Sequence, residues 1–298
     1  MKAEIKSFCL EYGYPNDAIA SILEDFEKLK HSEYYPLFKA YIDLYNTDDP
    51  SFSHKKALEI TKMISEKTKI CRYSLDLLLY ICMTEHCREL YDQAEIPVKV
   101  YHDSMLDLKW KMLECKNVND IWGIMVAPWF DRFFELSRFA LGRLEFDDNP
   151  STECYEKGGV KLGYGDWVIT VHVPSSGKLS IDECMKSFRT AAEFYADRFP
   201  DGIVKFRCDS WLLAPNLKDY LAPETNIRKF ADLFDVVEVS TTPQYGNWWR
   251  IFGKPYDESS IDYPSDTSLQ RAYLKMISDG NHPQTALGYL FMKDGNIL

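Results

Sequence analysis

The sequence predicts an α+β (mixed α/β) protein, and three observations support this prediction. Apolar residues recur at helical spacing through the first half of the chain. Beyond about Phe139 they alternate at the two-residue period of strands, and short strands then alternate with helices. The 298 residues contain no internal repeat and no low-complexity linker. We therefore predict a helical domain over residues 1–136 and a mixed-sheet domain over residues 137–298.

Five helices are predicted in the first half from their apolar spacing and their start signals. They begin after Pro15-Asn16, after Ser51 or Ser53, at Leu75, after Pro97 and after Pro128. The third, Leu75–Leu90, is apolar around most of its surface. A helix of that kind is normally buried, so we expect it at the centre of the domain.

The second half begins with a strand pattern over Leu141–Phe146, followed by Asp147-Asp148-Asn149-Pro150, which predicts a turn. Further strands are predicted over residues 167–173, 203–213, 236–240, 248–253 and 286–292. Helices are predicted from Ser180, over 217–234 and over 268–278. This alternation is typical of a sheet covered by helices.

Composition limits the class of protein. No apolar run approaches the ~18 residues of a membrane span, and the N-terminus lacks a signal-peptide core, so we expect a cytoplasmic protein without a membrane partner. The eight cysteines are then expected to be reduced thiols. A net charge of −11 argues against a nucleic-acid surface, which needs clustered Lys and Arg.

The segment from Trp167 to Ser180 is the most informative part of the chain. A strand ends in Pro174–Leu179, a loop of mainly small residues, and a helix begins directly afterwards. The unpaired N–H groups of such a helix start suit a phosphate or pyrophosphate. We expect the backbone at Ser175, Ser176 and Gly177 to approach the anion, and Lys178 to add a cationic donor.

An alternative interpretation of this helix start needs no ligand. Ser180 and Glu183 fit a capping box, S-x-x-E, in which each side chain satisfies an exposed backbone N–H of the other residue. The segment is then a well-capped crossover helix.

Several side chains are candidates for chemistry. His172 lies on the more polar face of the Trp167–Val173 strand and is a candidate general base, with a structural histidine as the alternative. Glu145 lies in an apolar strand and is a candidate active-site carboxylate, whereas Asp147 and Asp148 fit a turn. Cys208 is either a nucleophile or a small buried residue.

Two other groups have simpler explanations. Cys82, His86 and Cys87 lack a fourth zinc ligand, which favours helix packing and no metal site. Trp248 and Trp249 line either a substrate pocket or an interface of the core, and the second interpretation is favoured.

Several phrases of the second half resemble one family in combination. They are Leu141–Phe146, Val171-His172-Val173-Pro174, Phe194 to Phe199-Pro200, Cys208–Pro215 and Thr225-Asn226-Ile227. They resemble the bacterial acyltransferase domain-containing family. The resemblance implies a helical N-terminal domain packed on a GNAT-like mixed-sheet C-terminal domain.

The resemblance also implies a function, which is transfer of an acetyl or acyl group from acetyl-CoA or acyl-CoA to a small-molecule acceptor, an amine. The backbone at Val171 and Val173 would pair with pantetheine, and the loop Ser175–Ser180, including Leu179, would hold the pyrophosphate. His172 or Glu145 would remove the proton from the acceptor. The residues implied as donors to the departing thiolate are Ser210 and Cys208.

The chain departs from the usual Q/R-x-x-G-x-G/A loop of this family, because a single glycine, Gly177, stands in the corresponding segment. Two alternatives therefore stay open. One is a catalytically silent module that binds acyl-CoA or another small ligand. The other is a thiol hydrolase that uses Cys208 and His172.

Overall fold

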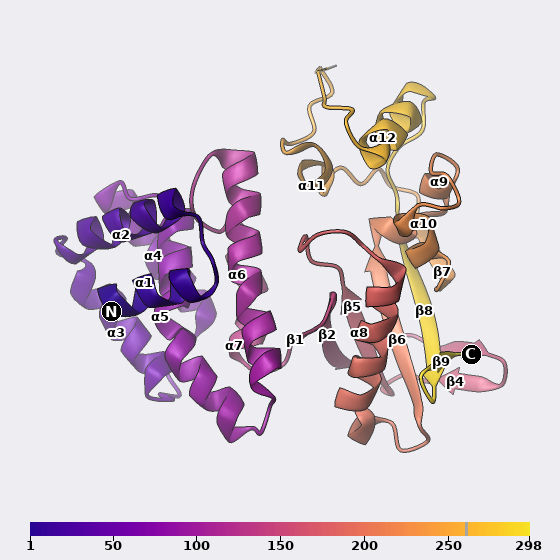
Figure 1. The fold of residues 1–298 in the computed structure, drawn as a ribbon, viewed down its shortest axis with the longest axis horizontal. Coiled ribbons are helices and arrows are strands. Elements are labelled where there is room, and N and C mark those ends of the chain that lie inside the picture. The colour runs from indigo at the N-terminus through magenta and orange to yellow at the C-terminus, as the bar shows by residue number, and fades with distance from the viewer. Residues whose placement is uncertain (260–261) are drawn as a thin grey trace. The chain divides into compact units, whose positions relative to one another are not determined.

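The computed structural model describes residues 1–259 and 262–298 and divides into two compact units, Met1–Phe139 and Ala140–Leu298 (Figure 1). The first unit contains α1 (Lys2–Glu11), α2 (Asn16–Lys30), α3 (Tyr35–Asn46), α4 (His54–Thr68), α5 (Arg72–Gln93), α6 (Val98–Asn119), η1 (Ala127–Trp129) and α7 (Asp131–Phe134). The mixed fold class that the sequence predicts is confirmed.

The strands follow from the end of the first unit onward. They are β1 (Phe139–Leu141), β2 (Leu144–Pro150), β3 (Tyr155–Lys157), β4 (Val160–Leu162), β5 (Trp167–His172), β6 (Ile203–Ser210), β7 (Asp235–Ser240), β8 (Thr285–Lys293) and β9 (Asn296–Ile297). The helices between them are α8 (Ile181–Phe194), η2 (Ala196–Arg198), η3 (Trp211–Leu213), α9 (Pro215–Lys218), α10 (Asn226–Ala231), α11 (Trp248–Phe252) and α12 (Ser268–Ser278).

The central helix of the first unit is α5, as its apolar sequence predicts. Leu75, Leu77, Leu78 and Leu79 point to different sides of this helix and are all buried. The helix α3 is not among the predicted helices, because its buried side chains are mostly aromatic and less typical of helices. Within residues 1–259 and 262–298, no helix combines the length and apolar character needed to cross a membrane.

The main sheet of the second unit has the order β1-β2-β5-β6-β8-β7, and β9 pairs with β8. The pair β5–β6 is parallel, whereas β2–β5, β6–β8 and β7–β8 are antiparallel. The strands β3 and β4 form a separate hairpin. Because β5 and β6 are parallel, the connection between them must cross over, and α8 is that crossover.

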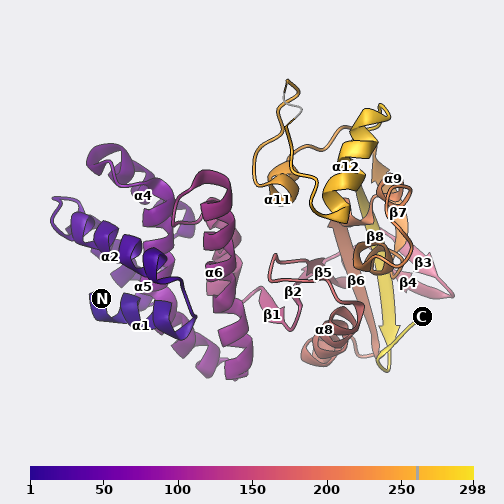
Figure 2. The ribbon, with the colours of Figure 1, turned by 45° about the horizontal axis from the view of Figure 1, so that its top comes forward.

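Different elements cover the two faces of this sheet, as Figure 2 shows. The helix α8 packs on one face through Phe188, whose ring lies 6.0 Å from Phe146 and 5.0 Å from Phe206. The β3–β4 hairpin covers part of the other face, where Leu162 and Val168 pack together in one buried cluster. Central strands are therefore buried on both faces.

The core beneath α8 depends on Phe206. Replacing Phe206 with Ala removes a fully buried ring, so we expect the free energy of unfolding to fall by about 3–5 kcal/mol in urea titrations. The matched change Val237→Ala, on an exposed position of the edge strand β7, is expected to stay within about 0.5 kcal/mol. Equal effects of the two substitutions would contradict this description of the core.

Two elements predicted between residues 217 and 253 are wrong. Residues Trp248–Phe252 form a helix instead of a strand, because Trp248, Ile251 and Phe252 are buried at helical spacing and Gly253 ends the turn at a φ of 68°. The helix predicted over 217–234 is two short helices, α9 and α10. The segment between them contains Pro223, which cannot donate a helix hydrogen bond.

Candidate functional site

The site begins where the parallel strands β5 and β6 separate. Their ladder joins Ile169 to Phe206 and Thr170 to Arg207, whereas β5 continues to His172 and β6 to Ser210. On its other side β5 stays paired with β2 as far as His172. Because the carboxyl ends of parallel strands meet at one edge, both strand ends lie on the same side of the sheet.

The loop 174–180 follows β5 and leads into α8. Gly177 has a φ of 119°, in the region that favours glycine. The loop therefore turns at the one residue of this segment that adopts such a conformation without strain. In the described chain, the Ser180 side chain makes no capping hydrogen bond, so the predicted capping box is wrong. The first N–H groups of α8 are therefore not satisfied by their N-cap side chain.

One arginine holds this loop. The Arg143 guanidinium donates from Nη1 to the carbonyl of Pro174 (2.9 Å), from Nη2 to that of Gly177 (2.9 Å) and from Nε to that of Lys178 (3.0 Å). Burial lowers the pKa of Arg143, but a guanidinium stays charged at neutral pH. Three bonds from one rigid planar group fix the loop in one conformation.

These three bonds also decide where the loop N–H groups point. The peptide bonds of the loop are trans, and in a trans peptide the C=O and the following N–H point in opposite directions. With three carbonyls directed at Arg143, the N–H groups of Ser175, Lys178 and Leu179 point away from it. The loop thus presents backbone donors on one side, next to the N-terminus of α8, which is an arrangement suited to an anion.

The β1–β2 turn that carries Arg143 is itself held by α8. The Ser187 hydroxyl accepts hydrogen bonds from the N–H groups of Arg143 (2.6 Å) and Leu144 (3.3 Å). Gly142 has a φ of 80°, and a Cβ there would lie 2.8 Å from the Ser187 oxygen. Only glycine therefore fits at this position without displacing Ser187.

Polar residues of β2 and β5 share the sheet face opposite α8. Asp147 lies in β2 and is buried, so the predicted turn over residues 147–150 is wrong. His172 Nε2 lies 2.6 Å from Asp147 Oδ1, and Glu145 is paired directly opposite His172. The structure thus brings two predicted site residues, His172 and Glu145, together with the carboxylate of Asp147, a residue predicted to lie in a turn.

Cys208, which the sequence offers as a candidate nucleophile, has the burial and the thiol pKa of an unreactive cysteine. Cys208 lies within the β6–β8 ladder opposite Gly288 and is buried, and burial raises the pKa of its thiol to about 12. A reactive cysteine needs a lowered pKa and access to solvent.

Ser210, another predicted site residue, lies at the carboxyl end of β6. Its hydroxyl accepts a hydrogen bond from the N–H of Leu212 (3.2 Å).

Alkylation distinguishes these thiols. We expect iodoacetamide to modify the exposed Cys154 in the native chain and to leave Cys208 unmodified, because the thiolate is the reacting species. Peptide mass spectrometry measures both, and a sample unfolded in guanidinium provides the positive control. Modification of Cys208 at the rate of Cys154 would restore the thiol hydrolase as an alternative.

In the helical unit, His86 pairs with carboxylates and not with the neighbouring cysteines. His86 bonds the carboxylates of Asp48 (2.9 Å) and Glu89 (3.1 Å), so it does not form a site with Cys82 and Cys87. The part of the chain that the structure describes contains no group of three or more His, Cys, Asp or Glu side chains placed to hold a metal ion.

Solved structures share this fold over nearly the whole chain. An acyltransferase mutant in complex with octanoyl-CoA matches with a TM-score of 0.64 and 16% identity, covering 96% of this chain and 98% of that one. An acyltransferase with decanoyl-CoA and teicoplanin, and one with CoA and 10C-teicoplanin, each match with a TM-score of 0.63, 17% identity and the same coverage. No curated protein matches the chain.

Family models match both halves of the chain. Residues 3–136 match the N-acyltransferase N-terminal domain, and residues 138–290 match the GNAT-like C-terminal domain. The second match alone spans half of the chain and includes the separated strands, the loop held by Arg143 and the helix α8. The chain therefore belongs to the acyltransferase family in which a helical N-acyltransferase N-terminal domain is joined to a GNAT-like C-terminal domain.

Proposed function

We propose that this protein transfers an acyl group from acyl-CoA to an amine on a small-molecule acceptor, with residues 1–136 as its helical domain and residues 137–298 as its transferase domain. The observation that carries the proposal is the loop held by Arg143 at the start of α8. Similar folds bind octanoyl-CoA, decanoyl-CoA and teicoplanin, which supports an acyl-CoA donor and a small-molecule acceptor.

In this proposal the donor binds along β5 and the loop. The pyrophosphate accepts hydrogen bonds from the loop N–H groups on the side away from Arg143 and from the first turn of α8, near Ser176 and Ser180. Lys178, which is exposed, adds positive charge. Beyond the β5–β6 ladder, backbone groups at Val171 and Val173 pair with pantetheine. Arg143 gives the loop its order although the usual glycine pattern is absent.

The chemistry follows from the end of β5. His172, oriented by Asp147, removes a proton from the acceptor amine, whose nitrogen then attacks the thioester carbonyl carbon. Backbone N–H groups of β5 stabilise the oxyanion. The C–S bond breaks as the amide forms, and the Ser210 hydroxyl gives its proton to the CoA thiolate while it takes another from solvent, to which His172 releases the amine proton. Glu145 is the alternative base, acting through water. Cys208 has no role, because its thiol is buried.

A transfer assay tests this function against its alternatives. The full chain is incubated with acyl-CoAs from acetyl to decanoyl and a panel of amine acceptors, while free CoA thiol and acylated amine are measured. We expect the two products in equal amounts. Binding of acyl-CoA without thiol release would indicate a silent binding module. Thiol release without acylated amine would indicate a hydrolase.

A further inference from the structure

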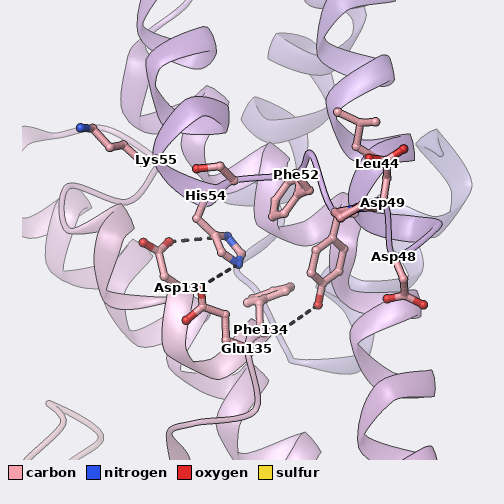
Figure 3. Close-up of a pocket in the computed structure, with 12 residues that line it drawn as sticks. Leu44, Asp48, Asp49, Phe52, His54, Lys55, Asp131, Phe134 and Glu135 are labelled. Atoms are coloured by element: carbon pink, nitrogen blue, oxygen red, sulfur yellow. Dashed lines mark hydrogen bonds and ion pairs between the residues drawn. The ribbon is translucent and has the colours of Figure 1, made fainter.

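A cavity of about 540 Å³ lies within the helical first unit (Figure 3). Its walls come from the end of α3, the segment before α4, the first two residues of α4, and α7 with the residue that follows it. The lining residues are Leu44, Tyr45, Asp48, Asp49, Pro50, Phe52, Ser53, His54, Lys55, Asp131, Phe134 and Glu135. Its volume is in the range of pockets that hold small molecules.

His54 is the unusual residue of this cavity. Its side chain is 7% exposed, and within the described chain its Nδ1 has no hydrogen-bond partner. Figure 3 shows the ring directed at Asp131 and Glu135. The separations are 3.6 Å from Nδ1 to Asp131 Oδ1 and 3.9 Å from Nε2 to Glu135 Oε1. Both exceed hydrogen-bond distance, so a buried polar ring lies between two carboxylates without bonding either.

The charge states of these groups follow from burial. Desolvation lowers the pKa of His54 to about 4, so the imidazole is neutral at pH 7.5. Burial raises the pKa of Asp131 to about 6, although the Tyr80 hydroxyl donates to its carboxylate (2.5 Å), so Asp131 is ionised at that pH. A neutral imidazole carries one N–H and one lone pair.

The carboxylates decide which imidazole nitrogen is protonated. Nδ1 lies nearer to Asp131, which is ionised and is the less exposed of the two carboxylates, and is therefore the nitrogen that carries hydrogen, which leaves the lone pair on Nε2 facing Glu135. A lone pair and a carboxylate repel each other unless a donor lies between them. A nitrogen about 2.9 Å from both atoms bridges a gap of 3.9 Å. The gap fits one nitrogen that donates an N–H group to each atom, and the carboxylate favours a nitrogen that carries positive charge.

The remaining walls favour the same ligand. Asp48, Asp49, Asp131 and Glu135 place four carboxylates around the cavity against one lysine, and Figure 3 shows the Lys55 side chain directed away from His54. Aromatic rings of Tyr45, Phe52 and Phe134 form the apolar part. Aromatic faces attract cations and accommodate apolar groups.

We propose that this cavity binds a primary ammonium group attached to an apolar substituent, with the ammonium bridging His54 Nε2 and the Glu135 carboxylate. The aromatic walls hold the substituent. The site is formed entirely by residues of the first unit and is tested with a different ligand from acyl-CoA, so either proposal can fail without the other.

Calorimetric titration of the full chain with 2-phenylethylamine at pH 7.5 tests the site. We expect one saturable site, and we expect 2-phenylethanol, which has the same shape without the charge, to bind at least about tenfold more weakly. Glu135→Gln should weaken amine binding by about tenfold, because it removes one charged hydrogen bond. Glu66→Gln, an exposed change elsewhere on α4, should leave it unchanged.

A second variant tests the histidine itself. His54→Phe keeps an aromatic ring among the neighbouring rings but removes the Nε2 acceptor, so we expect weaker amine binding with little change for the alcohol. Three results would overturn the proposal. They are equal affinity for amine and alcohol, equal amine affinity of the Glu135→Gln and Glu66→Gln variants, and no saturation by roughly 10 mM amine.

Discussion

Replacing His172 with Gln is expected to lower kcat for acyl transfer by about 10²–10⁴-fold, the usual contribution of a general base. Glutamine keeps some hydrogen-bonding capacity but cannot accept the amine proton. Because His172 Nε2 bonds Asp147, the lone pair that accepts the proton lies on Nδ1. Steady-state assays at saturating acyl-CoA measure this effect, and calorimetry should show acyl-CoA binding unchanged.

Asp147 is a positioning residue in this account, so its substitution gives a different result. Asp147→Asn is expected to lower kcat and also to shift the pH–rate profile, because an amide no longer stabilises the imidazolium. His282→Gln is the matched control, since that partly buried histidine bonds a loop carbonyl, Thr241 O, at 2.8 Å and lies outside the proposed site. If Glu145→Gln abolishes turnover while His172→Gln keeps it, Glu145 is the base.

Arg143→Ala is expected to raise the Kd for acyl-CoA by about tenfold to a hundredfold, because three charged hydrogen bonds to the loop are lost together. The loop carbonyls are then free to rotate, and the N–H groups no longer share one side. Arg143→Lys should recover only part of the affinity, because an ammonium cannot reproduce the planar fork of a guanidinium. Calorimetric titration with acyl-CoA measures all three proteins.

Arg189→Ala provides the control for this substitution. Arg189 lies on the same helix, α8, and its guanidinium bonds a single carbonyl, that of Gly295 (3.2 Å). We expect the Arg189→Ala variant to bind acyl-CoA with the affinity of the wild-type protein. An unchanged affinity in Arg143→Ala would show that the loop needs no guanidinium to hold its conformation.

Local sequence signals predicted the strand–loop–helix unit well. The alternating apolar residues of β5, the small residues from Pro174 and the apolar stripe of α8 are all contained in one short stretch. The contacts that complete the site were not predictable, since Arg143 reaches across 31 to 35 positions to the loop. Nothing in a Gly-Arg pair after a strand indicates which carbonyls the arginine binds.

The wrong predictions have the same origin. Asp147-Asp148-Asn149-Pro150 has the composition of a turn, but pairing with β5 extends β2 through it and buries Asp147 beside His172. The aromatic residues of α11 favour a strand by propensity, and burial on one helical face decides otherwise. In both segments tertiary contacts outweigh local preference.

Calorimetric titration of the full chain with CoA, acetyl-CoA, octanoyl-CoA and decanoyl-CoA tests most directly whether the loop held by Arg143 binds the CoA pyrophosphate. We expect saturable binding at one site for free CoA and for the acyl-CoAs, weakened by Arg143→Ala and unchanged by Arg189→Ala. Absence of binding by every one of these ligands would contradict this expectation.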